Sequence, residues 1–193
     1  MVIGILALQG DYAEHRSCLE KTALGCRLVR TPADLDGIAG LVIPGGESTA
    51  IKRLVASSGL VEPVMDLIER CIPVWGTCAG VVLLAKGGPW DVAGVRVERN
   101  AYGPQVYSRV VMARTSIAEG DVPLVFIRAP RIVDAPRDAS VLCRLGDEIV
   151  ALRWKNLLLT TFHPELAGGE PFTSYFASMV ASPPRRGGSM EGA

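Results

Sequence analysis

Short apolar runs alternate with amphipathic stretches of helical spacing through the first half of the chain. Alternation of this kind is typical of βαβ units, in which the strands form a parallel sheet. The strands are expected at residues 2–8, 26–30, 41–43 and 72–75. The helices are expected from the Asp11 turn to 24, and at 49–57, 60–70 and 81–86.

The segment Asp11-Tyr-Ala-Glu14 has the form of a capping box at the start of the first helix. We expect the Asp11 carboxylate to accept from the Glu14 backbone N–H, and the Glu14 side chain to reach back. Gly25 is expected just beyond the end of this helix, where a left-handed residue is common.

The second half contains short strand patterns with few helical stretches between them, so part of the sheet should be antiparallel or mixed. These strands are expected at about 94–99, 106–113, 124–127, 139–144, 148–153 and 156–162. A final helix is expected at 171–181, and no internal repeat or linker divides the chain. The pattern predicts one domain over 1–181, followed by a disordered tail over 182–193 that is rich in Pro, Gly and Ser.

Charge and cysteine usage exclude several classes of protein. Twenty basic and twenty acidic residues cancel, which argues against a general nucleic-acid binder and against a polybasic membrane-surface protein. No apolar run approaches the ~18 residues of a membrane span, and the run 2–8 lacks the basic flank of a signal peptide. Five cysteines without a CxxC pair indicate neither a disulfide framework nor a zinc cage. A cytoplasmic protein is expected, in which about four of the cysteines are small buried hydrophobes.

The segment Gly76-Thr-Cys-Ala-Gly80 stands between an apolar strand and a helix. A nucleophile with glycines at −2 and +2 has the pattern of a nucleophile elbow, whose sharp turn pushes the side chain of Cys78 out of the sheet. The N–H of Ala79, at the start of the next helix, is free to donate to an oxyanion. Alone, the pentapeptide equally fits a packed cysteine in a tight turn.

A second candidate is Phe162-His-Pro-Glu165, at the end of a strand pattern. Pro164 disfavours helix at His163 and should keep it extended, so that Glu165 points the same way and accepts from one ring nitrogen. The other nitrogen would then face the nucleophile, as in a catalytic triad. A lone histidine at a strand end is more often structural, but the chain has only His15 and His163 to serve Cys78.

A third candidate is the loop Pro44-Gly-Gly-Glu-Ser-Thr49 after the strand at 41–43. Consecutive glycines let backbone N–H groups turn toward a negative charge, so the loop could supply a second oxyanion donor. It lacks the Walker pattern of a phosphate loop. A helix-capping turn with Ser48 or Thr49 as the cap explains the residues equally well.

Two arginines, Arg99 and Arg128, follow apolar strands and could anchor a substrate carboxylate. From position alone, a structural ion pair is the more frequent role for each.

With these elements in place, the chain resembles the class I glutamine amidotransferases, whose ordered signature is a Gly-Gly loop, a G-x-C-x-G elbow and His-Pro-Glu. More narrowly, it is similar to the glutaminase subunits of pyridoxal 5'-phosphate synthases. The closer resemblance rests on Leu8-Gln-Gly10 with Glu14-His15, Pro44–Thr49, Gly76–Gly80, Val97-Glu-Arg-Asn100, Phe126-Ile-Arg-Ala-Pro130 and Phe162–Glu165. It implies an α/β fold of three layers, with a mixed, mostly parallel sheet and helices on both faces.

The resemblance also implies a mechanism. Cys78 attacks the side-chain carboxamide of L-glutamine, His163 carries the protons, and Glu165 fixes the imidazole. A γ-glutamyl thioester forms as ammonia leaves, and water then releases glutamate. Backbone amides at Gly46 and Ala79 would hold the oxyanion. The implied glutamine site consists of Gly46, Glu47, Ser48, Arg99, Ile127 and Arg128.

The resemblance implies a partner, because free ammonia is protonated and lost in water and one domain has no room for a second active site. The partner is a separate TIM-barrel synthase, in an assembly with twelve copies of each subunit, and Gln9 lies in the segment that meets it and helps to signal activation. No cofactor and no metal is implied for the glutaminase step.

Two departures from the family pattern leave the triad untouched. Pro104 stands where relatives often carry Arg, so any contact made by that Arg is absent, and the stretch 86–93 is short, which is expected to alter the partner surface. Three alternatives stay open from sequence. They are a glutaminase subunit of histidine or purine synthesis, a non-catalytic module on the same fold, and a cysteine peptidase or other hydrolase with an elbow.

Overall fold

The computed structural model describes residues 1–99, 101 and 108–183. Pro104 and residues 184–193 of the expected tail therefore lie outside the described residues. Within them, no helix combines the length and the apolar character that crossing a bilayer requires.

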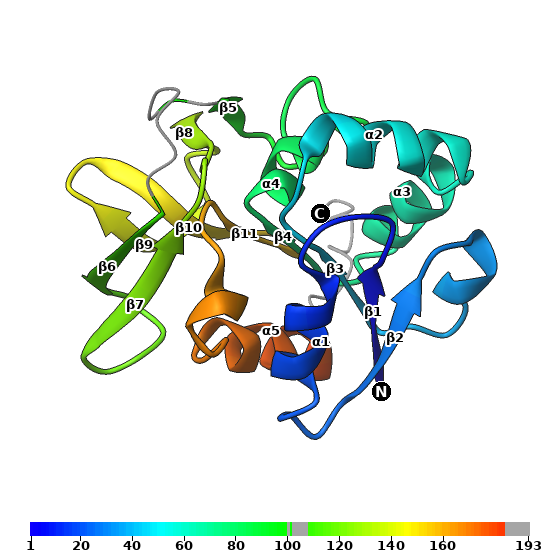
Figure 1. Ribbon diagram of the computed structural model, residues 1–193, viewed down its shortest axis with the longest axis horizontal. Helices are drawn as coiled ribbons and strands as arrows, with labels where there is room; N and C mark the ends of the chain where they lie inside the picture. The colour runs from blue at the N-terminus through cyan, green and yellow to red at the C-terminus, as the bar shows by residue number, and fades with distance from the viewer. Residues whose placement is uncertain (100, 102–107, 184–193) are drawn as a thin grey trace, which may run out of the picture.

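A mixed sheet of seven strands forms the centre of the molecule (Figure 1). Its order is β2 (Gly25–Val29), β1 (Val2–Leu6), β3 (Gly40–Ile43), β4 (Val74–Thr77), β11 (Leu157–Thr160), β10 (Glu148–Trp154) and β9 (Ser140–Leu145). The first five strands are parallel, and β10 is antiparallel to both β11 and β9. The expectation of a mostly parallel sheet with an antiparallel part in the second half is confirmed.

Helices cover both faces of this sheet (Figure 1). One face packs against α2 (Ser48–Ser57), α3 (Val61–Glu69) and α4 (Ala79–Leu84), and the other against α1 (Tyr12–Leu19) and α5 (Phe172–Ala181). In β3, Leu41 and Ile43 join the first core while Val42 joins the second, as the period of two along a strand requires. Burial on both faces explains why this strand is an unbroken apolar run.

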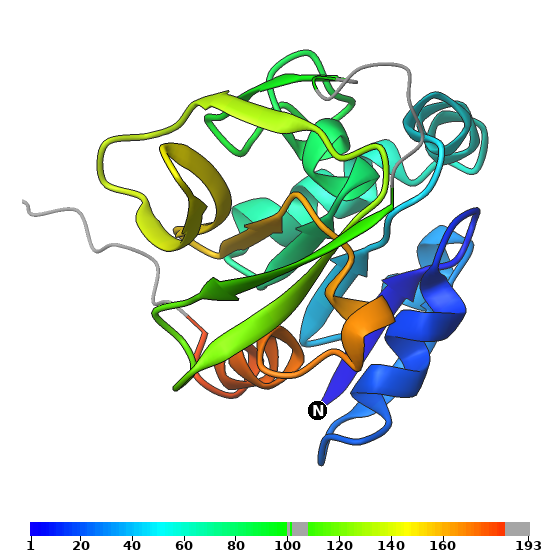
Figure 2. The same ribbon diagram turned by 60° about the vertical axis from the view of Figure 1, so that its left-hand side comes forward.

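Two short antiparallel ribbons lie beside the main sheet. The ribbon of β6 (Arg109–Arg114) and β7 (Asp121–Phe126) contributes apolar side chains to the α5 core, and Figure 2 shows it running along that face. The second ribbon joins β5 (Arg96–Glu98) to β8 (Arg131–Asp134). The sequence did not predict β8, because two of its four residues are exposed and its apolar pattern is correspondingly short.

The first helix is shorter than expected. It ends at Leu19 rather than at residue 24, and Gly25 begins β2 instead of following a helix end. The Thr22 hydroxyl donates to the Leu19 carbonyl oxygen at 2.7 Å and accepts from the Leu24 N–H at 3.3 Å. Such local side-chain bonds compete with the helix backbone, which is a physical reason for the early end.

Strand order brings the candidate motifs to one edge of the sheet. Because β1, β3, β4 and β11 are parallel neighbours, the segments after their carboxyl ends lie side by side. The pairing of Thr77 with Thr160 sets β4 and β11 level, and the Cys78 N–H donates to the Thr160 carbonyl oxygen at 2.8 Å. The turn that contains Cys78 and the segment that contains His163 therefore begin at the same level of the sheet, next to each other.

Candidate active site

Cys78 occupies a sharp turn between β4 and α4. Its φ of 45° and ψ of −103° are sparsely populated for a residue with a side chain, and α4 begins at the next residue. A Cβ on Gly80 would lie 2.1 Å from the Ile43 carbonyl oxygen, and one on Gly76 would lie 2.8 Å from Leu84 Cδ1. Both flanking glycines are therefore required by close approach, as the elbow pattern predicts.

His163 and Glu165 form a buried hydrogen-bonded pair. Nδ1 of His163 donates to Oε1 of Glu165 at 2.8 Å, and the Glu165 side chain is fully buried. His163 itself is not helical, as predicted, and has φ −105° and ψ 84°. The chain does not stay extended beyond it, because a 3-10 helix, η2 (Pro164–Ala167), starts at the next residue. The proline occupies the first position of that helix, where its missing N–H costs nothing. Glu165 reaches the imidazole from this turn instead of from a strand.

A second carboxylate contacts the same ring nitrogen. Oδ2 of Asp11 lies 3.1 Å from Nδ1 of His163, and the Asp11 side chain is one-third exposed. The predicted capping box is wrong: Asp11 makes no side-chain hydrogen bond to the first turn of α1, and Glu14 is exposed. The Asp11 carboxylate, which the sequence pattern assigned to capping α1, instead contacts His163.

His15 lies behind Glu165 in the interior. Its Nε2 is 3.1 Å from Thr77 Oγ1 and 3.2 Å from Glu165 Oε2, and its ring meets Trp75 edge-on. Burial lowers the pKa of His15, which keeps this imidazole neutral. The contact with Oε2 is close but poorly aligned for a hydrogen bond, so that buried oxygen has no well-formed partner among the described residues.

These surroundings make His163 a strong base. Burial alone would lower its pKa, but hydrogen bonding to Asp11, to the Cys78 sulfur and to Glu165 outweighs burial and raises the pKa of His163 to about 12. The same hydrogen bond to His163 lowers the pKa of Asp11. The structure thus brings Cys78, His163 and Glu165 together, as predicted, and adds Asp11.

The ligand atoms of Asp11, His163 and Glu165 all lie within 4.8 Å of one another, a spacing that three ligands of one metal ion could also have. Nδ1 of His163, however, already donates its hydrogen to Glu165 Oε1 at 2.8 Å, and Asp11 Oδ2 lies 3.1 Å from the same nitrogen as an ion-pair contact. A metal would have to replace the hydrogen that the bond to Glu165 uses. We assign the group to proton chemistry.

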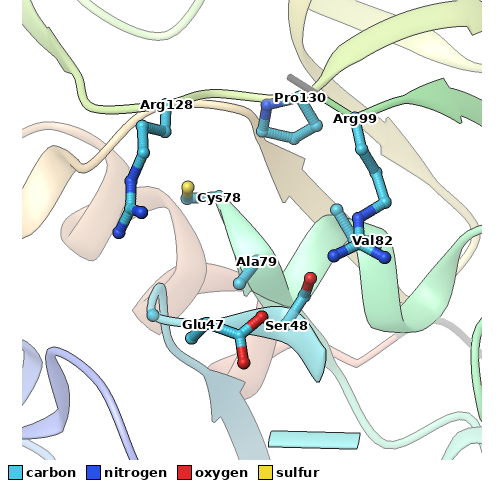
Figure 3. A pocket seen from close by; sticks show the side chains of 9 residues that line it. Glu47, Ser48, Cys78, Ala79, Val82, Arg99, Arg128 and Pro130 are labelled. Carbon is cyan, nitrogen blue, oxygen red and sulfur yellow. The ribbon is translucent and has the colours of Figure 1, made fainter. Parts of the chain in front are cut away.

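A pocket with about 450 Å³ of empty space, its mouth included, opens beside the sulfur. Five of the six predicted glutamine-site residues line it, namely Gly46, Glu47, Ser48, Arg99 and Arg128, together with Cys78 and Ala79. Figure 3 shows Arg99 and Arg128 on opposite sides of the pocket, with the sulfur between them. Ile127 is not part of the lining, but its carbonyl oxygen lies 3.7 Å from the Cys78 sulfur.

Neither arginine of the pocket is used in an ion pair within the described residues. Arg99 donates to the Thr49 hydroxyl at 3.1 Å, whereas Arg131 pairs with Glu98 and Glu148. The structural ion pair that position alone favoured is therefore taken by a different arginine. Arg128, which is exposed, is available to a ligand.

The loop after β3 is held by Glu47 and Gln9. Glu47, rather than Ser48 or Thr49, caps α2: its carboxylate accepts from the N–H groups of Thr49 and Ala50, and these bonds lower its pKa. Gln9 Oε1 accepts from the Glu47 N–H at 2.9 Å. The residue predicted to relay activation thus contacts the candidate oxyanion loop directly.

Sequence reasoning missed Asp11, His15 and Thr77 as members of this site. Asp11 directly precedes α1 and His15 lies in the first turns of that helix, where its N–H donates to the Asp11 carbonyl oxygen at 3.2 Å. An acidic residue followed four residues later by a histidine, directly after the first strand, was a signal that the capping-box interpretation obscured.

The sequence matches the SNO glutamine amidotransferase family over residues 5–182. The chain belongs to this family. Among its relatives, pyridoxal 5'-phosphate synthase subunit PdxT of Dehalococcoides mccartyi is 44% identical, over 93% of this chain and 97% of the relative. The protein of the same name from Thermosipho africanus is 42% identical, over 93% of this chain and 99% of the relative.

Solved structures agree with this membership. A crystal structure of a glutamine amidotransferase superposes with a TM-score of 0.86 at 36% identity and covers 94% of this chain and 100% of its own. PurLQS of Thermotoga maritima, at 17% identity, has a TM-score of 0.70 over 93% of this chain and 97% of its own, and shows the shared fold only. The three-layer fold implied by the family resemblance is confirmed.

Proposed function

We infer that this chain is the glutaminase subunit of a pyridoxal 5'-phosphate synthase and supplies ammonia from L-glutamine. The observation that carries the inference is a basic imidazole, His163, held by buried Glu165 and facing Cys78 at the floor of a pocket that contains two arginines. Relatives over 40% identical are named as subunits of that synthase, which supports the choice of pathway.

The triad carries out acyl transfer in two stages. His163 takes the proton of the Cys78 thiol, and the sulfur attacks the carboxamide carbon of glutamine. His163 then passes that proton to the amide nitrogen, the C–N bond breaks, and ammonia leaves a γ-glutamyl thioester. In the second stage His163 deprotonates water, which attacks the thioester, and glutamate departs as the thiol is restored. Glu165 keeps the Nδ1 hydrogen in place throughout, so that the other nitrogen faces sulfur and substrate.

The pocket provides for the two ends of the substrate. Backbone amides at Gly46 and Ala79 stabilise the oxyanion, since Ala79 is the first residue of α4 and has no partner for its N–H inside the helix. At the other end, Arg99 and Arg128 attract the α-carboxylate, and Glu47 and Ser48 attract the α-ammonium group. Ile127 lies beside the reacting sulfur through its carbonyl oxygen.

The partner in this proposal is a separate synthase subunit with a TIM-barrel fold, in an assembly of twelve copies of each chain. Gln9 is assigned to the activation path because it joins the β1–α1 segment to the oxyanion loop through Glu47. We place the protein in the cytoplasm, which the five unpaired cysteines favour. Residues 1–181 form the single glutaminase domain of this proposal.

The direct test mixes the purified chain with a pyridoxal 5'-phosphate synthase subunit, a pentose phosphate, a triose phosphate and glutamine. We expect formation of pyridoxal 5'-phosphate to depend on the chain when glutamine is the only nitrogen source. Added ammonium salt should replace the chain. Ammonia release that is supported by a histidine or purine synthesis partner, but not by this synthase, would contradict the proposed pathway while leaving the glutaminase chemistry standing.

Arg128→Ala is expected to raise the KM for glutamine by about 10- to 100-fold, with a much smaller change in kcat. The loss corresponds to one charge-assisted contact to a carboxylate, about 1.5–3 kcal/mol. Residue 128 has a φ of 46°, which alanine and arginine tolerate equally, so the backbone strain is unchanged. Arg53→Ala on α2, whose side chain is exposed outside the pocket, is the matched control. An unchanged KM would remove Arg128 from the glutamine site.

A further inference from the structure

Asp11 sits where a helix cap belongs but does not act as one. It occupies the N-cap position of α1 with φ −87° and ψ 37°, and its side chain makes no hydrogen bond to the first turn. Instead its Oδ2 lies 3.1 Å from Nδ1 of His163. A residue that gives up a stabilising helix cap in this way is expected at functional sites, where the side chain is needed for another contact.

Nδ1 of His163 faces two carboxylates. Glu165 Oε1 accepts the Nδ1 hydrogen at 2.8 Å, and Asp11 Oδ2 lies 3.1 Å from the same nitrogen as an ion-pair contact. Glu165 is fully buried and approaches from η2, whereas Asp11 is one-third exposed and approaches from the β1–α1 segment. The ring is thus held by two separate parts of the chain.

The position of Asp11 is fixed by the loop after β3. Its backbone N–H donates to the Gly45 carbonyl oxygen at 3.2 Å. A Cβ on Gly45 would lie 2.9 Å from Asp11 Oδ2 and 2.4 Å from His163 Cε1. Only a residue without a side chain at position 45 lets the carboxylate and the imidazole meet there, which shows that this contact is built into the packing.

We propose that Asp11 is a positioning residue, a second carboxylate that lies against Nδ1 of His163 and holds the imidazole toward Cys78. The proposal rests on the proposed glutaminase function. Asp11 does not touch the substrate. It restricts rotation of the ring, which sets the direction of the nitrogen that takes the thiol proton, and it stabilises the imidazolium formed in both stages.

Four groups face His163 or its partner from the surrounding elements. Glu165 comes from η2, Asp11 from the β1–α1 segment, and Cys78 from the turn before α4. His15 of α1 lies behind Glu165 and is neutral, because burial lowers its pKa. Asp11 and Glu165 both favour the charged imidazolium, and Asp11, although one-third exposed, raises the pKa of His163 more than Glu165 does.

The test uses Asp11→Asn, which keeps the size of the side chain and removes its charge. The chain has only two histidines, so a nuclear magnetic resonance titration of the imidazole Cε1–H groups yields two signals, and a His15→Gln sample assigns them. We expect the pKa of His163 to fall by about one unit in Asp11→Asn. Asp36→Asn, an exposed aspartate whose side chain is remote from the triad, should leave it unchanged.

Kinetics with the synthase subunit present supply the second readout. We expect kcat to fall by about 10-fold in Asp11→Asn and further in Asp11→Ala, with the KM for glutamine within about 3-fold of the original. A purely structural role would lower stability without moving the His163 titration. A folded Asp11→Asn chain with an unchanged His163 pKa, or with an unchanged kcat, would overturn the proposal.

The titration needs neither substrate nor partner, so it separates this proposal from the proposed function. If the original chain released no ammonia from glutamine in any assembly, the function would fail while the link between Asp11 and His163 could still be read from the titration. If the chain is active and the titration does not respond to Asp11, only the positioning role fails.

Discussion

Cys78→Ala is expected to abolish glutamine hydrolysis, with a fall in kcat of at least about 10³-fold in the assembly with the synthase subunit. Alanine removes the sulfur that forms the thioester, and neither His163 nor Glu165 can replace it as a nucleophile in this geometry. The effect should be chemical rather than structural, because alanine fits at the N-terminus of α4 and fills less space than cysteine. Ammonia release measured under saturating glutamine is the readout.

A matched control distinguishes the reacting cysteine from the others. Cys26 lies on β2, partly buried and away from the pocket, and Cys26→Ala should retain activity. Synthesis of pyridoxal 5'-phosphate from ammonium salt should also persist with Cys78→Ala, since the synthase chemistry is on the other chain. Full glutaminase activity of Cys78→Ala would show that another group attacks the substrate.

Glu165→Gln is expected to lower kcat by about 10²- to 10⁴-fold. The amide is nearly the same size, but it carries no charge and can turn its NH₂ group toward Nδ1 of His163. That nitrogen must then accept rather than donate, and the hydrogen moves to the nitrogen that has to take the thiol proton. The pKa of His163 should fall as well, because Glu165 is one of the groups that raise it.

The kinetic signature separates this effect from a loss of binding. The KM for glutamine should change little, since Glu165 is fully buried behind the imidazole and does not line the pocket. Glu14→Gln makes the same chemical change on the exposed side of α1 and is the matched control. A Glu165→Gln chain with the original kcat would mean that another group, with Asp11 the nearest candidate, orients the base.

The main features of the fold could be predicted from the sequence because its central strands are buried on both faces. The run at 41–43 reads as a strand without reference to any partner, and the glycines around Cys78 predict the turn that the structure contains. Such features depend on local sterics and on burial. The weakest predictions were the ends of elements, such as the end of α1 at Leu19, where the Thr22 hydroxyl competes with the helix backbone.

The site was predicted in part, for a similar reason. Cys78, His163 and Glu165 lie in motifs whose spacing carries their chemistry, and parallel neighbouring strands bring those motifs together. Asp11 could not be assigned to the site from spacing, because Asp11 and Glu14 also fit the pattern of a capping box. Its contact with His163 depends on the packing of Gly45 against both groups. Such packing joins segments that are far apart in the sequence, so a local sequence pattern cannot reveal it.

The central claim is that Cys78 is the sulfur that glutamine acylates. The most direct measurement treats the assembled complex with a reactive glutamine analogue and locates the label by mass spectrometry of peptides, with and without glutamine. The account predicts a single label on Cys78, which glutamine suppresses and His163→Ala slows. A label on another cysteine, or one on Cys78 that glutamine does not reduce, would contradict it.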